Sequence, residues 1–226
     1  MSSRPQRAPI VVLISGRGSN MRALVERSRE PAMGYEVSAV LSDNPAAKGL
    51  ALARDLGVTA RALAPAEAAD WAAYELELAA AIDEHAPSLI ALAGFMRILS
   101  AQFVARYAGR ILNIHPSLLP KFPGLHTHRR ALEAHEAQHG ATVHFVTEQL
   151  DGGPPVIQAQ VKVEADDDED SLAARVQSQE HRIYPLAVHW YCTGRLRYAQ
   201  GRAWLDGAPL CGPVQYGAER RPEVAE

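Results

Sequence analysis

Short apolar runs alternate with segments of helical periodicity along most of this sequence, and that alternation restricts the fold more than any other feature. An unbroken apolar run is typical of a strand buried on both faces, and apolar residues spaced three and four apart are typical of a helix. We expect strands at residues 10–14, 37–41, 58–63, 88–93, 111–114, 141–147 and 155–163. We expect helices at residues 21–25, 48–56, 71–82, 127–138 and from 171 to 179 or beyond. Because strand–helix–strand units build parallel sheets, the predicted fold is α/β, a Rossmann-like, mostly parallel open sheet with helices on both faces.

Polar residues and a glycine mark the expected ends of two of these helices. Ser19 and Asn20 are N-cap candidates for the first helix, because a short polar side chain can accept a hydrogen bond from a free N–H of the first turn. The helix over 127–138 is expected to end at His139 and Gly140. Glycine just past a periodic segment is a common helix end.

Composition narrows the class of protein. The 226 residues are 47% hydrophobic and 22% charged, and this length suits one large α/β domain as well as two small ones. A formal net charge of −3 gives no electrostatic reason to expect a nucleic acid or an anionic membrane as partner. No apolar run approaches the ~20 residues of a membrane span, and the N-terminus has no apolar signal segment. Two cysteines, Cys192 and Cys211, form no disulfide framework, so we predict a reduced, cytoplasmic protein.

A polar pair stands where one of the expected strands ends. Asn113 and His115 are two residues apart, so strand alternation places both side chains on the same face. Asp151, in a glycine-rich turn, is the candidate to orient the imidazole, and a neighbouring carboxylate is expected to raise the pKa of that imidazole. An amide donor beside a proton donor meets the requirements of acyl transfer. We therefore predict Asn113, His115 and Asp151 as catalytic residues.

Two loops that follow expected strands are candidate binding segments. Residues 15–20 precede a helix, where free N–H groups and the helix dipole favour a phosphate. They lack the ending of a Walker loop and the full glycine pattern of a dinucleotide site. An ordinary strand–helix turn explains them equally well. Residues 96–99 follow another strand end, where open α/β sheets bind ligands, and a loop that covers the core explains them as well.

Four histidines raise the question of a metal site. They are His126, His128, His135 and His139. His135 and His139 would lie one turn apart on the expected helix, yet no cysteine or third ligand has a matching spacing. We expect a helix start and its solvated face here, and no metal.

Six segments, taken in this order, are similar to one known family. They are Ile10–Asn20, Leu92–Leu99, Asn113–Pro120, Leu125–His128, His144–Thr147 and Gln179–His181. Together they resemble the phosphoribosylglycinamide formyltransferases of purine synthesis that depend on 10-formyltetrahydrofolate. The resemblance reaches residue 205 or so and implies the formyltransferase fold.

The resemblance also implies a domain organisation. It implies a single formyltransferase domain over residues 1–226. Within it, residues of about 10–100 would bind the phosphoribosyl group, and residues of about 101–205 would bind the folate and carry the catalytic groups. Residues 206–226 would form a C-terminal tail.

The same resemblance implies a reaction and a role for each site residue. The formyl group of 10-formyltetrahydrofolate, the co-substrate, would pass to the amine of 5-phosphoribosylglycinamide, the third step of de novo purine (IMP) synthesis. Gly18, Ser19 and Asn20 would hold the phosphoribosyl group, and Glu180 the glycinamide. The implied folate contacts are Met96, Arg97, Ile98, Leu99, Asn113 and His144. Asn113 would polarise the formyl oxygen, His115 would supply protons, and Asp151 would support the charged imidazole and order water.

One departure and three alternatives accompany this prediction. Some relatives carry an arginine that reaches the folate tail, and the matching position here is Trp71. A formyltransferase that acts on methionyl-tRNA or a sugar nucleotide shares the Asn-x-His…Asp core, as does a formyltetrahydrofolate hydrolase, but each usually has a further domain that we do not expect here. A non-catalytic folate-binding or nucleotide-binding module is the third alternative. A monomer and a homodimer are both compatible with the sequence.

Overall fold

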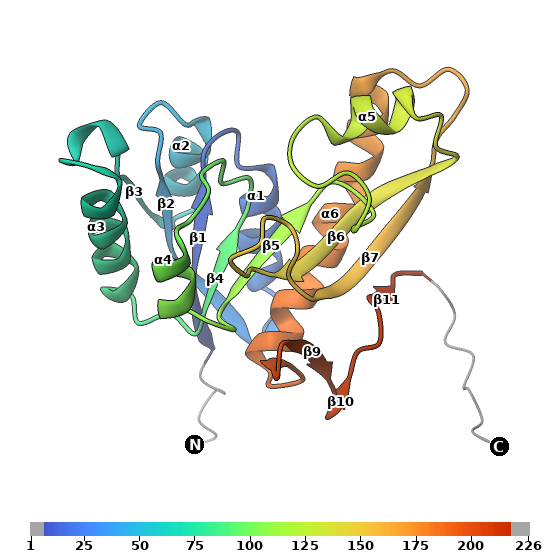
Figure 1. Cartoon of the computed structure of the whole chain (residues 1–226). Coiled ribbons are helices and arrows are strands. Elements are labelled where there is room, and N and C mark those ends of the chain that lie inside the picture. The colour runs from blue at the N-terminus through green and yellow to red at the C-terminus, as the bar shows by residue number, and fades with distance from the viewer. Residues whose placement is uncertain (1–6, 218–226) are drawn as a thin grey trace.

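An eight-stranded sheet runs through the protein in the order β11-β7-β6-β5-β4-β1-β2-β3, as the computed structural model shows (Figure 1). The structure describes residues 7–217. The strands of this sheet are β1 (Ala8–Ile14), β2 (Tyr35–Ser42), β3 (Thr59–Ala62), β4 (Leu89–Leu92), β5 (Ile111–His115), β6 (Gln138–Phe145), β7 (Pro155–Lys162) and β11 (Val214–Gln215). The helices are α1 (Ser19–Ser28), α2 (Lys48–Asp55), α3 (Trp71–Asp83), α4 (Ala101–Arg106), α5 (Thr127–Glu133) and α6 (Glu169–Cys192), with single 3₁₀ turns η1 (Pro31–Met33) and η2 (Pro65–Glu67).

The sheet is mostly parallel. β3, β2, β1, β4 and β5 pair in parallel, whereas β6 pairs antiparallel with both β5 and β7. The chain goes from β1 outward to β2 and β3 and then returns to β4 on the other side of β1. In open α/β sheets, ligands bind where the strand order reverses in this way. The predicted α/β class and mostly parallel open sheet are confirmed.

Helices cover both faces of the sheet, so β1 is buried on both faces. Ile10, Val12 and Ile14 belong to the core cluster that also contains residues of α1 and α6. Val11 and Leu13 belong to the cluster on the other face, with residues of α3 and α4. The strand alternation therefore assigns successive residues of one apolar run to two separate cores.

The long helix α6 contacts two neighbouring strands in the middle of the sheet through a buried tyrosine. Its N-terminus has a capping box, in which Asp168 accepts from the N–H of Ser171 and the Ser171 hydroxyl accepts from the N–H of Asp168. The helix continues through Pro185 to Cys192. The hydroxyl of Tyr184, fully buried, lies 2.9 Å from the carbonyl oxygen of Leu92 and 3.0 Å from that of Leu112. It thus bridges β4 and β5, the two strands on which the site is built.

Two predicted helix ends are wrong. The N-cap of α1 is Gly18, while Ser19 and Asn20 already belong to the first helical turn. The helix predicted over 127–138 ends at Glu133, and β6 begins at Gln138. His135 is left-handed (φ 52°), with hydrogen bonds from its N–H to the carbonyl of Leu132 and from the N–H of Glu136 to that of Ala131. This is a Schellman stop without the usual glycine, so the sequence carries no signal of it.

The C-terminal region contributes strands as well. β8 (Leu196–Ala199), β9 (Arg202–Leu205) and β10 (Ala208–Pro209) form a small antiparallel sheet, and β11 pairs in parallel with β7 at the edge of the main sheet. The part of the predicted tail up to residue 217 is therefore structured, and residues 218–226 lie outside the described residues, as do residues 1–6 of the predicted domain. Among the described helices, none has the length and apolarity to cross a bilayer.

Candidate active site

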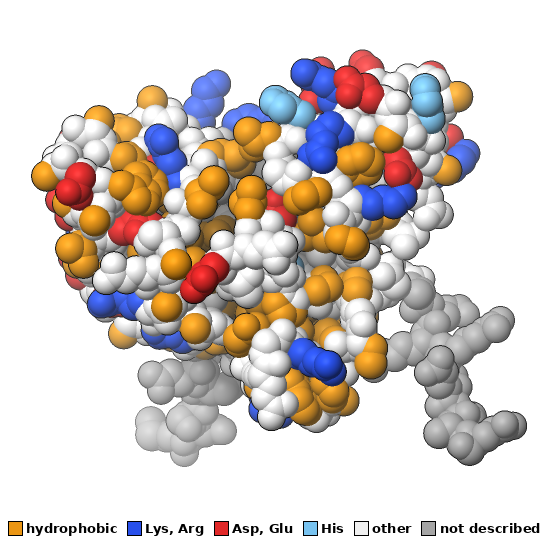
Figure 2. Space-filling view, in the orientation of Figure 1, with side chains coloured by type: hydrophobic (Ala, Val, Ile, Leu, Met, Phe, Trp, Pro, Cys, Tyr) orange, Lys and Arg blue, Asp and Glu red, His pale blue; other side chains and the backbone are white. Residues whose placement is uncertain are grey.

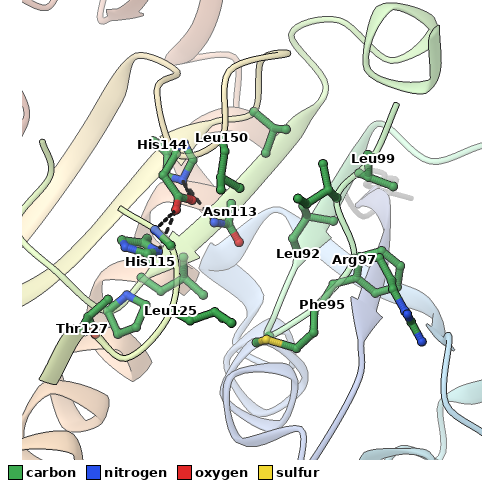
Figure 3. A pocket seen from close by; sticks show the side chains of 18 of the residues that line it. Leu92, Phe95, Arg97, Leu99, Asn113, His115, Leu125, Thr127, His144 and Leu150 are labelled. Atoms are coloured by element: carbon green, nitrogen blue, oxygen red, sulfur yellow. Dashed lines mark hydrogen bonds and ion pairs between the residues drawn. The ribbon is translucent and has the colours of Figure 1, made fainter. Parts of the chain in front are cut away.

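A cavity of about 440 Å³ opens at the carboxyl ends of β4 and β5. Figure 2 shows hydrophobic side chains around the hollow in the middle of this face. The lining residues come from segments 92–99, 113–116, 124–128 and 144–151, with Val104 and Glu169. The close view separates two sides, with Asn113, His115 and His144 on one and Leu92, Phe95 and Leu99 on the other (Figure 3). A polar group of side chains therefore faces an apolar wall.

Asn113 and His144 form a cross-strand pair. The two residues are directly opposite each other on β5 and β6, so their side chains meet on the same face of the sheet. Nδ1 of His144 lies 2.9 Å from the carbonyl oxygen of Phe145, which can only accept, so its Nε2 is the acceptor for the Asn113 amide at 3.1 Å. This bond uses one of the two N–H groups of the Asn113 amide. The other can donate to a ligand in the cavity.

His115 lies between a carbonyl and a carboxylate. Its Nε2 is 2.9 Å from the carbonyl oxygen of Phe122, and its Nδ1 is 3.5 Å from Oδ2 of Asp151. The predicted shared face of Asn113 and His115 is confirmed, since both line the cavity. The predicted direction of the pKa shift is wrong: burial, the largest influence, lowers the pKa of His115 below its ordinary value, although the Phe122 carbonyl and the Asp151 carboxylate both act to raise it.

Asp151 is held as a carboxylate. Burial acts to raise its pKa, but the neighbouring His144, a hydrogen bond from the Gly124 N–H and the nearby His115 hold the pKa below its usual value. Oδ2 accepts from the N–H of Gly124 at 2.8 Å, and Oδ1 is 3.6 Å from Nε2 of His144. The glycine-rich turn that carries Asp151 is required sterically, because a Cβ on Gly153 would lie 1.8 Å from the carbonyl oxygen of Phe145.

The segment Met96–Leu99 forms one wall of the cavity, and contacts in and just after the segment hold it in place. The N–H of Met96 donates to Oγ of Ser15 at 2.8 Å. Nε of Arg97 donates to Oδ2 of Asp43 at 2.6 Å, and that carboxylate is almost completely buried. Just beyond the segment, Ser100 donates to the buried carboxylate of Glu75 through both its N–H and its hydroxyl. All four residues of the segment line the cavity.

Gly18, Ser19, Asn20 and Glu180 gather at the N-terminus of α1, and none of them lines the cavity. Nδ2 of Asn20 donates to Oε2 of Glu180 at 2.7 Å. Glu180 is buried, which raises the pKa of its carboxyl, whereas the sequence alone favours an exposed helical carboxylate. Oδ1 of Asn20 is buried and has no hydrogen-bond partner among the described residues. Gly18 is left-handed (φ 78°), and a Cβ there would lie 2.9 Å from Cα of Gly49, so this helix start requires glycine.

The four histidines between residues 126 and 139 are distributed over three segments of the structure. No group of three or more histidine, cysteine or acidic side chains in the part of the chain that the structure describes is placed to hold a metal ion. His135 follows α5 and His139 lies in β6, so the two do not share a helix. Instead, Nε2 of His139 lies 3.2 Å from Nδ1 of His128.

Sequence reasoning missed several parts of the site. Asp43 and Glu75, which hold the 96–99 segment, gave no signal because they reach it from other elements. Phe122, whose carbonyl faces His115, carries no polar side chain that would mark it. Leu125 and His126 also line the cavity, and the only signal for them is that they belong to a segment of the family resemblance. Trp71 does not line the cavity, and its ring packs 5.0 Å from that of Tyr74.

Comparison with known proteins decides the family. The family model described as formyl transferase matches residues 8–188. The chain belongs to the formyl transferase family. It is 52% identical to the phosphoribosylglycinamide formyltransferase of Escherichia coli strain K12, over 93% of this chain and 99% of that protein. It is 40% identical to the enzyme of the same name from Haemophilus influenzae, over 89% of this chain and 95% of that one.

The fold of this formyltransferase agrees with that of solved relatives. The phosphoribosylglycinamide formyltransferase from Coxiella burnetii, in complex with CHES, matches with a TM-score of 0.88 and 42% identity, over 92% of this chain and 100% of that chain. The formyltransferase fold implied by the sequence is therefore confirmed. The resemblance that six short segments indicated extends over nearly the whole chain.

Proposed function

We propose that this formyltransferase moves the formyl group of 10-formyltetrahydrofolate to the amine of 5-phosphoribosylglycinamide. The products would be N-formyl-phosphoribosylglycinamide and tetrahydrofolate. The observation that carries the proposal is the convergence of Asn113, His115 and Asp151 at one side of the cavity. The relatives named above support the choice of acceptor, because their names state it.

The cavity suits the folate. Its apolar wall would contact the flat pterin ring, and the backbone of Met96–Leu99 would hydrogen-bond to the ring edge. Met96 and Ile98 are 64% and 70% exposed, so a bound ring would cover them. His144 would act through Asn113, to which it is bonded. Trp71 does not line the cavity, so we assign it no contact with the folate.

The N-terminus of α1 suits the phosphoribosyl group. Free N–H groups and the helix dipole favour a phosphate there, beside Gly18 and Ser19. The buried Asn20–Glu180 pair would receive the glycinamide part, with the unpartnered Oδ1 of Asn20 available to accept. We propose that residues of about 10–100 bind the phosphoribosyl group and that residues of about 101–205 bind the folate and carry the catalytic groups. Residues 96–99, at the end of the first part, would also contact the folate.

The chemistry is a direct transfer. The amine attacks the formyl carbon, a C–N bond forms, and the tetrahedral oxyanion accepts hydrogen bonds from Asn113 and His115. The bond to the folate nitrogen then breaks as that nitrogen gains a proton through His115 or water, and the attacking amine loses one. Asp151 stabilises the imidazolium. Holding both substrates side by side accounts for much of the reduction in the activation free energy. The proposed steps use neither a metal nor a covalent enzyme intermediate.

We further propose a cytoplasmic enzyme, monomeric or homodimeric, with these small molecules as its partners and no nucleic acid or membrane. The deciding experiment follows tetrahydrofolate release from 10-formyltetrahydrofolate with and without 5-phosphoribosylglycinamide. Release that requires the amine, with formylated product, supports the proposal. Equal release without the amine would identify a hydrolase, and no release in either case would indicate another acceptor or a binding module.

A further inference from the structure

The ring of His115 is oriented by a backbone group outside the cavity. Its Nε2 lies 2.9 Å from the carbonyl oxygen of Phe122. A carbonyl can only accept, so Nε2 carries a hydrogen, and Nδ1 is the nitrogen that gains or loses a proton. Nδ1 faces Asp151 at 3.5 Å. The Phe122 carbonyl therefore selects both the tautomer and the orientation of His115.

Phe122 holds that carbonyl in a backbone conformation that phenylalanine rarely adopts. Its φ is +54°, in the left-handed region. Non-glycine residues are uncommon there because Cβ crowds the backbone, so the surrounding structure must hold the conformation in place.

The side chain of Phe122 supplies the restraint. Its ring packs edge-on against the ring of His139, with 6.1 Å between centroids and 73° between planes. The guanidinium of Arg130 lies over the same ring at 5.3 Å. Nη1 of Arg130 also donates to the carbonyl oxygens of Pro123 at 2.6 Å and Leu125 at 3.3 Å. The ring is thus held from β6 on one side and from α5 on the other.

Arg130 and His139 form a clamp around the Phe122 ring, and the two differ in charge: the arginine is a cation, and the histidine is neutral. His139 is 1% exposed, and burial lowers its pKa to about 4, so it packs against Phe122 as a neutral ring. Besides burial and the Phe122 carbonyl, the side chains that affect the pKa of His115 are Asp151, which raises it, and His144 and Arg130, which lower it. Phe122 does not line the cavity. It can therefore influence the reaction only through another residue.

We propose that Phe122 is a positioning residue for His115: its ring, held between Arg130 and His139, keeps its carbonyl oxygen on Nε2 of the catalytic imidazole. The proposal rests on the proposed function to the extent that His115 is the proton donor. It concerns a residue with no direct contact to the substrates.

The test compares three variants of the full-length protein. Phe122→Tyr retains the ring and should keep kcat near that of the wild type. Phe122→Ala loses the ring but keeps the backbone penalty, and we expect kcat to fall roughly 10- to 100-fold, as a catalytic group displaced by about 1 Å would cause. Phe122→Gly loses the ring but adopts a positive φ freely, so its kcat should lie between the other two. KM for each substrate should change little.

A direct readout on His115 separates positioning from simple stability. Ring ¹H–¹⁵N NMR spectra, with His115→Gln as the assignment control, report the tautomer and the pKa of His115 without any turnover. In Phe122→Ala the Nε2–H tautomer should lose its dominance, and the pKa of His115 should fall further, because the carbonyl that raises it has moved. A lower Tm with an unchanged His115 spectrum and unchanged kcat would overturn the proposal. A Phe122→Gly variant with wild-type kcat would do so as well.

The two proposals can fail separately. If the wild type transfers no formyl group to 5-phosphoribosylglycinamide, the proposed function fails, while the NMR comparison still decides whether Phe122 positions His115. If transfer is confirmed and the spectrum of His115 is the same in wild type and Phe122→Ala, only the positioning role is wrong.

Discussion

The two sides of the cavity differ in how many of their side chains are already buried and in contact with one another. On the polar side, His115, His144 and Asp151 have side chains that are at most 7% exposed and already face one another at hydrogen-bonding or ion-pair distances. On the apolar side, Met96 and Ile98 are 64% and 70% exposed. The polar side is therefore organised before a ligand arrives, whereas the apolar side awaits a ligand to cover it. Preorganised dipoles favour a transition state, and exposed apolar surface favours binding.

The largest effect is expected from the polar side. Asn113→Ala removes an oxyanion donor and should lower kcat by about 10²–10³-fold with little change in KM for either substrate, the loss seen when one such donor is removed. Steady-state kinetics with each substrate varied in turn checks this. A rise in KM without a loss of kcat would assign Asn113 to the binding side of the cavity.

A second prediction concerns His139, the buried histidine that packs against Phe122. The pKa of His139 is about 4 in the folded protein, against an ordinary 6.5, so the unfolded state binds more protons between these values. Its contribution to stability is complete above pH 6.5 and is lost as the pH falls toward 4, which amounts to roughly 3 kcal/mol of unfolding free energy at about 1.4 kcal/mol per pKa unit.

Urea unfolding of the wild type and of His139→Gln across this pH range measures the difference. The His139→Gln protein should show the shallower decline toward acid pH, with any loss of packing appearing equally at every pH. Parallel curves for the two proteins would contradict the assignment. His115 and His128, whose pKa values are also lowered mainly by burial, contribute in the same direction in both proteins.

A third prediction concerns the apolar side. Ile98→Ala removes apolar surface that a bound folate would cover, and about 1–2 kcal/mol of lost burial corresponds to roughly a tenfold higher KM for 10-formyltetrahydrofolate. KM for 5-phosphoribosylglycinamide and kcat should stay within twofold or so. Leu76, at 66% exposed, lies on α3 outside the cavity, so Leu76→Ala is the matched control and should change neither KM. Equal effects of the two substitutions would break the contrast between the sides.

The smallest effect is expected at the ion pair between Asp43 and Arg97, a tether that holds the apolar wall of residues 96–99. Asp43→Asn keeps the shape of the side chain but removes its charge, and Arg97, itself 47% exposed, loses its ion pair. Because Asn keeps the acceptor oxygen and the Arg97 guanidinium is half in solvent, we expect KM for 10-formyltetrahydrofolate to rise by no more than about fivefold, or about 1 kcal/mol. Kinetics of Asp43→Asn and Arg97→Lys, measured together, give this value. A loss of kcat without a change in KM would show that the tether serves the chemistry instead.

Much of the fold could be read from the sequence because it depends on local pattern. Apolar runs predicted β1, β2, β4 and β5 to within three residues at each end, since the strands of a parallel sheet are buried on both faces. The helix around Tyr74 was predicted from its spacing and confirmed. The end of α5 could not be predicted, because His135 adopts a left-handed conformation that only the packing around it explains.

The candidate site divides in the same way. The shared face of Asn113 and His115 follows from strand alternation alone, and the link to a distant Asp151 was a hypothesis from residue type. The Asn113–His144 pair depends on the register of β5 against β6, and the Asn20–Glu180 bond joins residues 160 positions apart. Such distances are invisible in a single sequence. The predicted rise in the pKa of His115 failed because burial outweighs the neighbouring carboxylate.

The sequence by itself determined the α/β class, the strand that carries Asn113 and His115, and the family, because short-range pattern and residue type decide these. Only the tertiary structure decided which groups touch the catalytic imidazole and how strongly each acts. The carbonyl of Phe122, the clamp of Arg130 and His139, and the burial of Glu180 arise from segments that meet after folding. Electrostatic strength depends on distance and on exclusion of water, and both are properties of packed side chains.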